Sequence, residues 1–242
     1  MKTIVYERPK MDDGVLVAGW PGMGFLAKIT VDYLAEELRA KPVAEIIVPQ
    51  NEIVFTDGVG ELLRTTHKIY HYAPKNLLIL RGGNQPQYIE EVYALANKVL
   101  DIAQELNVRK VITVAAMPED FDGEPKIFGI VNNEELLEYL KQFEIPALKG
   151  TGSVLGLNGV LIGVAAERNI EGICLMGQIK YIDIPQPTTA RVVLRLLSRM
   201  LNLDISLSRI EKMIEEVEKP IVEELERRSR RVKERERPGY IS

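Results

Sequence analysis

Apolar and polar positions along the chain form two alternating patterns, which predict strands and helices in turn. Short apolar runs such as Val15–Ala18 and Leu77–Leu80 are typical of strands buried on both faces. In segments such as Phe25–Leu38, apolar residues fall on one face at a helical spacing, which predicts amphipathic helices. The predicted strands cover residues 14–19, 43–48, 77–80, 110–115, 127–131 and 173–177, and the predicted helices cover residues 25–39, 86–106, 133–143, 159–168 and 188–202.

Strands that alternate with helices in this way predict an α/β fold, with a mixed, largely parallel central sheet flanked by helices on both faces. One region departs from the alternation. Residues 53–57 and 60–72 alternate between polar and apolar around Asp57-Gly58, which predicts a hairpin. Pro49 is expected to end the strand that precedes this hairpin.

The last part of the chain predicts a helix that packs on another helix, followed by a tail. From Leu207 to Ile221 the apolar residues are spaced alternately three and four apart, as in the seam between two helices. We therefore expect an α/β domain over residues 1–203 and a long C-terminal packing helix over 204–225, interrupted at Pro220.

Residues 226–242 are expected to form a basic projecting tail. Residues 226–237 carry seven basic and three acidic residues, a charge of +4. Since the whole chain has a net charge of −4, the rest of the chain carries −8. A single apolar residue, Val232, cannot form a buried face, so we expect this tail to be solvated, frayed or bound to a partner. Its candidate partner-binding residues are Arg230, Arg231, Tyr240, Ile241 and Ser242.

Composition narrows the class of protein. The 242 residues are 46% hydrophobic, enough for the core of one α/β domain. The single cysteine, Cys174, forms no internal disulfide and fits an intracellular protein. The absence of a signal peptide or an apolar run of about 18 residues predicts a cytoplasmic protein that is not in a membrane. A net charge of −4 argues against nucleic acid as the main partner.

The segment Gly19-Trp20-Pro21-Gly22-Met23-Gly24 joins a buried strand to a helix. Together with Ala27 it matches a dinucleotide pattern, but the acidic residue expected at the end of the second strand is missing. A tight turn with close helix–sheet packing is the better interpretation. Trp20 is expected to be exposed on this loop as a partner contact or stacking platform, with core packing as the equal alternative.

A second glycine-rich loop, Gly150–Gly159, contains Thr151 and Ser153. Its backbone amides could cradle a phosphate, but it lacks the lysine of a nucleotide-binding P-loop and the spacing of a nucleophile elbow. We interpret it mainly as a packing turn. The residues expected to shape the two loops are Gly19, Pro21, Gly22, Gly24, Gly150, Gly152, Gly156 and Gly159.

Other chemically capable residues remain isolated in the sequence. His67 and His71 stand four apart without a cysteine pair to complete a zinc site. Glu119, Asp120 and Asp122 can be a catalytic pair or a solvated turn. Cys174 lies in an apolar strand and is expected to be inert. The sequence therefore predicts no catalytic residues, no metal site and no cofactor.

Two motifs, in order, resemble the proteasome assembly chaperone family, in the branch named for the second chaperone. The first is the loop 19–25 followed by Tyr33–Leu38, and the second is Gly156–Leu161 followed by Gly172–Gly177. The resemblance covers roughly residues 1–203. It implies a fold similar to purine nucleoside phosphorylases, used as an oligomeric scaffold without known catalysis, an archaeal or similar source, and involvement with proteasome α subunits.

Some members of that family carry a C-terminal hydrophobic–Tyr–any-residue tail that docks between α subunits. This chain departs from that pattern, because it ends Gly239-Tyr240-Ile241-Ser242. We hypothesise a non-catalytic homo-oligomeric assembly chaperone or adaptor, whose partners are itself and another protein, possibly proteasome subunits. The alternative is a nucleoside- or phosphate-binding enzyme that uses the two glycine-rich loops.

Overall fold

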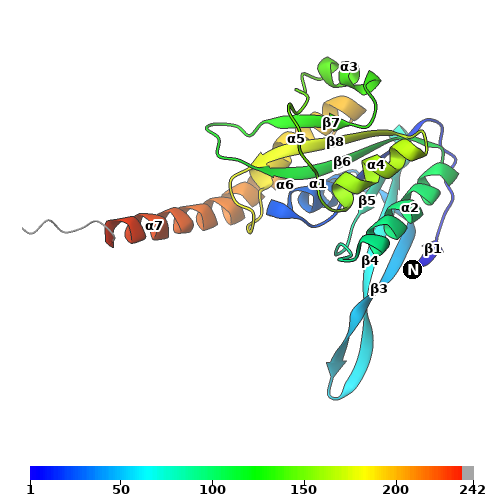
Figure 1. The fold of residues 1–242 in the computed structure, drawn as a ribbon, viewed down its shortest axis with the longest axis horizontal. Helices are drawn as coiled ribbons and strands as arrows, with labels where there is room; N and C mark the ends of the chain where they lie inside the picture. The colour runs from blue at the N-terminus through cyan, green and yellow to red at the C-terminus, as the bar shows by residue number, and fades with distance from the viewer. Residues whose placement is uncertain (236–242) are drawn as a thin grey trace, which may run out of the picture.

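A single mixed sheet forms the centre of the protein in the computed structural model, which describes residues 1–235 (Figure 1). Within those residues the sheet has eight strands in the order β1-β3-β4-β5-β2-β6-β8-β7. The strands are β1 (Lys2–Val5), β2 (Gly14–Gly19), β3 (Lys41–Thr56), β4 (Val59–Tyr72), β5 (Leu77–Arg81), β6 (Val108–Pro118), β7 (Ile127–Val131) and β8 (Glu171–Ile179).

Parallel pairing occupies the middle of this sheet. Strands β5, β2, β6 and β8 run parallel to one another, whereas β1, β3 and β4 on one side and β7 on the other pair antiparallel with their neighbours. The central strands are the continuous apolar runs, which need cover on both faces. The predicted mixed α/β sheet is confirmed.

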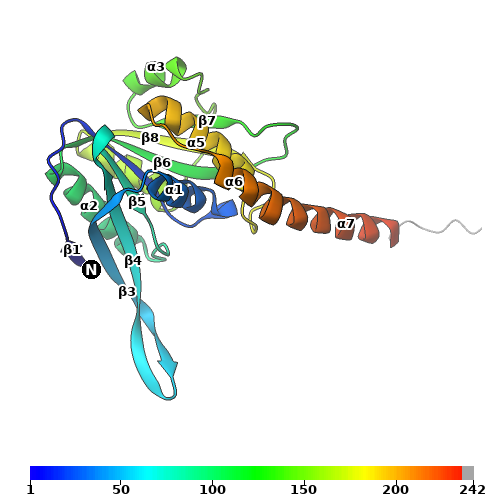
Figure 2. The same ribbon diagram turned by 180° about the vertical axis from the view of Figure 1, so that it is seen from behind.

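Helices cover both faces of the sheet (Figures 1 and 2). On one face, α1 (Leu26–Glu37), preceded by the 3-10 turn η1 (Met23–Phe25), packs beside α5 (Pro187–Leu201). On the other face lie α2 (Ile89–Glu105) and α4 (Leu157–Glu167). A short turn η2 (Ala73–Lys75) precedes β5, and α3 (Glu135–Gln142) lies beside β7.

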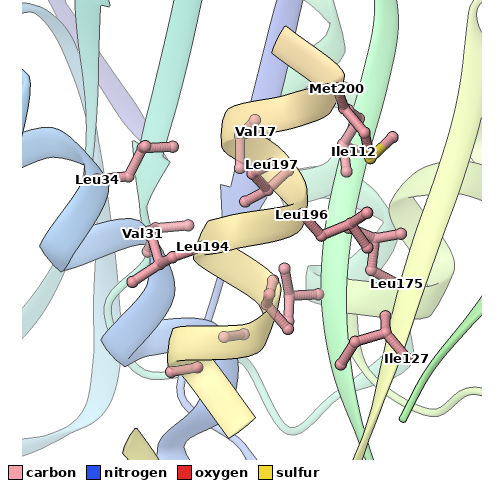
Figure 3. Packing of buried hydrophobic residues seen from close by; sticks show 14 of the residues in the cluster. Val17, Val31, Leu34, Ile112, Ile127, Leu175, Leu194, Leu196, Leu197 and Met200 are labelled. Carbon is pink, nitrogen blue, oxygen red and sulfur yellow. The ribbon is translucent and has the colours of Figure 1, made fainter. Parts of the chain in front are cut away.

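The two largest buried apolar clusters lie on opposite sides of the sheet, one under each pair of helices. Figure 3 shows the first, in which Val31 and Leu34 of α1 and Leu194 and Leu197 of α5 meet Val17 of β2. Burial of a large aliphatic side chain contributes about 1.5–3 kcal/mol. The predicted helical spacing therefore corresponds to faces that fix the helices on the sheet.

Strands β3 and β4 continue beyond the sheet as a two-stranded arm (Figures 1 and 2). The predicted turn at Asp57-Gly58 is confirmed, because both residues have positive φ, 50° and 81°. The prediction that Pro49 ends its strand is wrong. The register shifts between Pro49 and Ile53, and β1 pairs only as far as Ile47, so the proline removes no ladder hydrogen bond at that open edge.

The C-terminal helix consists of three pieces: α6 (Ser208–Met213), the π-helical segment η3 (Ile214–Glu218) and α7 (Lys219–Arg235). Lys219 has right-handed helical angles, so no break separates η3 from α7 and the helix continues through Pro220. The expected interruption takes the form of the π-helical turn shortly before the proline, which lacks the N–H of a regular helical residue. The helical backbone continues beyond the expected boundary at Leu225, with support from the Glu224–Arg228 ion pair at 2.8 Å. Helix α7 projects away from the body (Figures 1 and 2).

Candidate functional site

The carboxyl ends of the parallel strands share one edge of the sheet, where small molecules usually bind in open α/β folds. The glycine-rich loop after β2 and the loop Gly82–Gln85 after β5 lie there, together with the N-terminus of α4.

The β2–α1 loop makes its own backbone contacts. The Gly24 amide donates to Ile182 O at 2.8 Å, and the Phe25 amide donates to Gly22 O at 3.0 Å. The Leu26 amide donates to Met23 O. An anion site at a helix N-terminus needs such amides free. These three amides already donate to carbonyl groups of the chain, so they are not available to an anion.

Gly24 and Gly19 let the chain pack closely around this loop. Gly24 has φ +61°, and a Cβ there would lie 2.7 Å from Cγ of Gln186. A Cβ at Gly19 would lie 2.7 Å from the Ala27 carbonyl oxygen, so this glycine allows α1 to approach β2. Both positions act through close approach of the backbone.

Trp20 is fully buried, with 0% of its surface exposed. Its indole Nε1 donates to His67 Nδ1 at 3.1 Å. A Cβ added at Gly82 would collide with the indole ring and would lie 2.7 Å from Gly19 O. Of the two interpretations of Trp20, exposure as a partner contact is wrong and core packing is observed, because the glycine-rich exit of β5 leaves room for the ring.

His67 accepts two hydrogen bonds at one ring nitrogen. Besides the Trp20 indole, the Gly83 amide donates to Nδ1 at 3.0 Å. Burial lowers the pKa of His67 to about 4, so the ring is neutral at physiological pH. His71 lies farther along β4, and burial lowers its pKa as well. Among the described residues, no three or more His, Cys, Asp or Glu side chains are grouped to hold a metal ion.

Gln85 joins the two glycine-rich loops. Its Nε2 donates to the Pro21 carbonyl at 2.6 Å, and its Oε1 accepts from the Leu157 amide at 2.7 Å. The amides of Gly159 and Val160 both donate to Gly156 O. The first turn of α4 is therefore capped by a neutral side chain and by its own backbone.

Asn158 forms a second connection from α4 to the β2 exit. Its Oδ1 accepts from the Trp20 amide at 3.1 Å, and its carbonyl accepts from Thr113 Oγ1 at 2.5 Å. We did not predict roles for Gln85, Asn158 or Thr113. Asn158 lies within the Gly156–Leu161 motif of the family resemblance, but nothing in the sequence indicates that it contacts Trp20.

The glycines of the second loop fall into two groups. A Cβ at Gly156, which has φ +76°, would lie 2.5 Å from Gln85 Oε1, and one at Gly159 would lie 2.8 Å from Val154 Cβ. Gly150 and Gly152 have no atom within 4 Å of an added Cβ. Close packing therefore requires glycine only in the second half of this loop.

A cavity of about 430 Å³ remains beside the two loops. Its polar lining consists of the side chains of Gln85, Ser153 and Asn158 together with exposed backbone, and no lining residue among those described is ionisable. The apolar lining residues include Met23, Ala27, Ala115, Ala116, Val154, Leu155 and Met176. The cavity thus offers neither a fixed charge for a phosphate nor an acid or base for catalysis.

A model of the PAC2 family matches residues 16–225. This chain belongs to the PAC2 family. The predicted resemblance to proteasome assembly chaperones is confirmed by this match and by the solved structures that the chain resembles.

Two of those structures come from the archaeon Pyrococcus furiosus. PbaB, described as an archaeal proteasome activator, has a TM-score of 0.79 and 28% identity, over 93% of this chain and 98% of PbaB. PbaA, described as an archaeal homolog of proteasome-assembly chaperone, has a TM-score of 0.73 and 23% identity, over 98% and 100%. Uncharacterized protein MJ1210 of Methanocaldococcus jannaschii is 25% identical over 206 residues, 84% of this chain and 79% of that relative.

The remaining candidates of this PAC2 family chain are the carboxylates that follow β6, at the carboxyl edge of the parallel strands, and the cysteine within β8. Glu119, Asp120 and Asp122 are all exposed, and Glu119 accepts a hydrogen bond from Gln178 at 2.6 Å. Cys174 is buried, and burial raises the pKa of its thiol to about 11, so the thiol is protonated at physiological pH.

The candidate tail residues are only partly within the described structure. Arg230 and Arg231 lie on the backbone of α7, and their side chains are not described. Tyr240, Ile241 and Ser242 lie outside the described residues. Within residues 1–235, no helix is both long and apolar enough to span a bilayer.

Proposed function

We propose that this PAC2 family chain is a non-catalytic, cytoplasmic, homo-oligomeric assembly chaperone or adaptor whose partners are proteasome subunits. Similarity to PbaA and PbaB supports proteasome subunits as the partner. Because one of these relatives is described as an assembly chaperone homolog and the other as an activator, both free α subunits and the finished core particle are candidate partners.

The observation that carries this proposal is at the carboxyl edge of the parallel strands, which we call the closed edge because its loop donors are bonded within the chain. The crevice between β2 and β5 is filled by Trp20, and the loop amides from Gly24 to Leu26 donate to backbone carbonyls of the chain. Gln85 occupies the Leu157 amide at the start of α4. A scaffold needs such loops to be rigid, whereas a phosphate-binding enzyme needs their donors free.

We propose that the basic C-terminal segment contacts the partner. Arg230 and Arg231 contribute charge, and Tyr240, Ile241 and Ser242 add contacts at the end of the chain. Trp20 is not proposed again as a partner contact, since it is buried. Charge complementarity at such a segment speeds association and depends on salt.

Native mass spectrometry of the full chain with archaeal proteasome α subunits, and separately with the assembled core particle, tests the partner. We expect a complex with at least one of the two. A variant truncated after Leu225 should form the same homo-oligomer but bind the partner less. Unchanged binding by this variant would remove the tail from the proposal, and no complex in either mixture would remove the partner.

The second candidate function, a nucleoside- or phosphate-binding enzyme, draws its support from the 430 Å³ cavity and its Ser153 lining. Calorimetry with phosphate, nucleosides and dinucleotides tests it on the same preparation. Our proposal predicts no saturable heat. Saturable binding that Gly22→Leu or Gly152→Leu abolishes would favour the enzyme instead.

A further inference from the structure

The arm formed by β3 and β4 exposes five large apolar side chains within a short stretch of the hairpin. The exposed fractions are 63% for Ile53, 52% for Val54, 71% for Phe55, 70% for Val59 and 43% for Leu62. An isolated two-stranded hairpin is marginally stable in water, and apolar side chains gathered in this way on a surface mark an interaction site.

These side chains are divided between the two faces of the arm. Cross-strand partners share a face, and Ile53 pairs with Leu62 while Phe55 pairs with Gly60. Ile53 covers the space above Gly60, where an added Cβ would lie 3.0 Å from its Cδ1. The opposite face carries Val54 and Val59 with Glu61 and Thr56.

The outer edge of β3 is open along this arm. Strand β1 pairs with β3 from Ala44 to Ile47, and no other strand among residues 1–235 pairs with Ile53–Thr56 on that edge. An exposed apolar strand edge is a template for pairing with another chain. The partner must therefore supply an extended segment of matching character.

We propose that this partner is a second copy of the chain, paired antiparallel along the β3 edge with its two-fold axis at Val54. This inference rests on the homo-oligomer of the proposed function and names its interface. The segment Glu52-Ile53-Val54-Phe55-Thr56 is complementary to itself in that register. Ile53 of each copy then faces Phe55 of the other, Val54 faces Val54, and Glu52 faces Thr56.

This register joins apolar cross-strand pairs and places no like charges directly opposite, both of which favour pairing. It also extends the Ile53, Phe55 and Leu62 face across both arms as one apolar stripe. The β4 edge offers a poorer match, because Gly60 and Glu61 stand in its middle and a glycine weakens a strand. An interface in which each copy presents the same patch closes as a dimer contact.

Disulfide trapping tests this register directly. Cys174 is the sole cysteine in the sequence and is buried, so Val54→Cys introduces a single accessible thiol. Directly opposite residues of an antiparallel pair have Cα atoms about 4.5–5.5 Å apart, within the range of about 4.4–6.8 Å that a disulfide spans. We expect Val54→Cys to form a crosslinked dimer under mild oxidation.

Val59→Cys is the matched control, since Val59 lies on the same face of the same arm and is at least as exposed. In the proposed four-stranded arrangement the two Val59 residues are separated by three strand spacings, about 14 Å, and by four residues along the strands, about 13 Å, which gives about 19 Å in all. Its crosslinking should be at least roughly tenfold slower. Equal rates at the two positions would overturn the register.

A charge at the axis provides a second measurement that needs no oxidation. Val54→Lys places two lysines opposite each other, and we expect the association constant from native mass spectrometry or sedimentation to fall about 100-fold. If Val54→Lys leaves a homo-oligomer intact, the arm interface is wrong and the oligomer of the proposed function stands. If the wild-type chain is a monomer at all concentrations, both fail.

Discussion

The closed edge of the sheet buries its aromatic residue, whereas the open arm exposes its aromatic residue to solvent. At the edge, Trp20 is fully buried and its indole N–H is bonded to His67. On the arm, Phe55 is 71% exposed and the β3 edge beside it has no strand partner within the described chain. Both regions belong to the same sheet, because β5 pairs with β2 on one side and with β4, which continues into the arm, on the other.

This difference separates the glycine-rich loops of this PAC2 family chain, which pack within the molecule, from the arm, which our proposal makes the contact surface. Gly82 and Gly156 let Trp20 and Gln85 of the same molecule approach, so loop donors that an α/β enzyme would offer to a ligand are bonded within the chain. The strands that leave the body are free to meet another protein.

The largest effect that separates the two regions is expected from their aromatic residues. Trp20→Ala should lower the free energy of unfolding by about 3–5 kcal/mol, because it removes a buried ring and leaves a cavity. Phe55→Ala should change it by less than about 0.5 kcal/mol when measured by denaturant titration at high dilution.

Phe55→Ala should instead weaken self-association at higher concentration. If Phe55→Ala destabilises the dilute chain as much as Trp20→Ala does, the arm is part of the core and the comparison between the two regions fails.

A pH dependence of similar size is expected at the closed edge. The pKa of His67 is lowered from 6.5 to about 4 in the folded chain. Below pH 6.5 the unfolded chain therefore binds a proton that the folded chain does not, so His67 makes stability fall from about pH 6.5 to about pH 4. The contribution is about 3 kcal/mol and is absent above pH 6.5.

Denaturant titrations between pH 4 and pH 7 measure this dependence. His67→Gln should remove most of that fall, whereas His71→Gln, at a less buried histidine, should remove less. Parallel pH profiles for the wild-type chain and His67→Gln would show that His67 is not the group responsible.

A pair of glycine substitutions sharpens the distinction between packing and open space. Gly82→Ala should cost about 1–3 kcal/mol, because its methyl group would collide with the Trp20 ring. Gly152→Ala has no atom within 4 Å of its new Cβ and should stay within about 0.5 kcal/mol of the wild-type chain. Thermal unfolding of the two variants side by side is sufficient, and equal costs would contradict the packing role of Gly82.

The smallest effect is expected where the projecting helix joins the body. Buried Glu218 accepts hydrogen bonds from the amide and hydroxyl of Thr188, at 2.8 and 2.7 Å, in the first turn of α5. Glu218→Ala should cost about 1 kcal/mol, as the loss of a helix cap does. Exposed Glu216→Ala is the control in the same denaturant titration, and no difference between them would show that the cap contributes nothing.

Much of the fold was predictable because local patterns determine it. The apolar runs at β2 and β5 predicted buried strands, and Asp57-Gly58 predicted a turn that needs two residues with positive φ. Asn133, just before α3, accepts a hydrogen bond from the Glu135 amide at 3.0 Å, as asparagine commonly does at the start of a helix.

The candidate site was less predictable because its contacts join distant parts of the chain. The hydrogen bond between Trp20 and Asn158 links residues 138 positions apart, and Gln85 clamps two loops that neither precede nor follow it directly. A loop position favours exposure, but Gly82 provides space for the Trp20 ring, and no local rule connects those two residues.

Hydrogen–deuterium exchange of the full chain tests the central claim most directly, namely that the loop amides are already bonded within the molecule. The amides of residues 24–26, Leu157, Gly159 and Val160 should exchange slowly in the isolated chain and should not slow further with phosphate or a nucleoside. Protection gained on self-association should appear at residues 52–56. Fast exchange at residues 24–26, with protection on adding phosphate, would contradict the account.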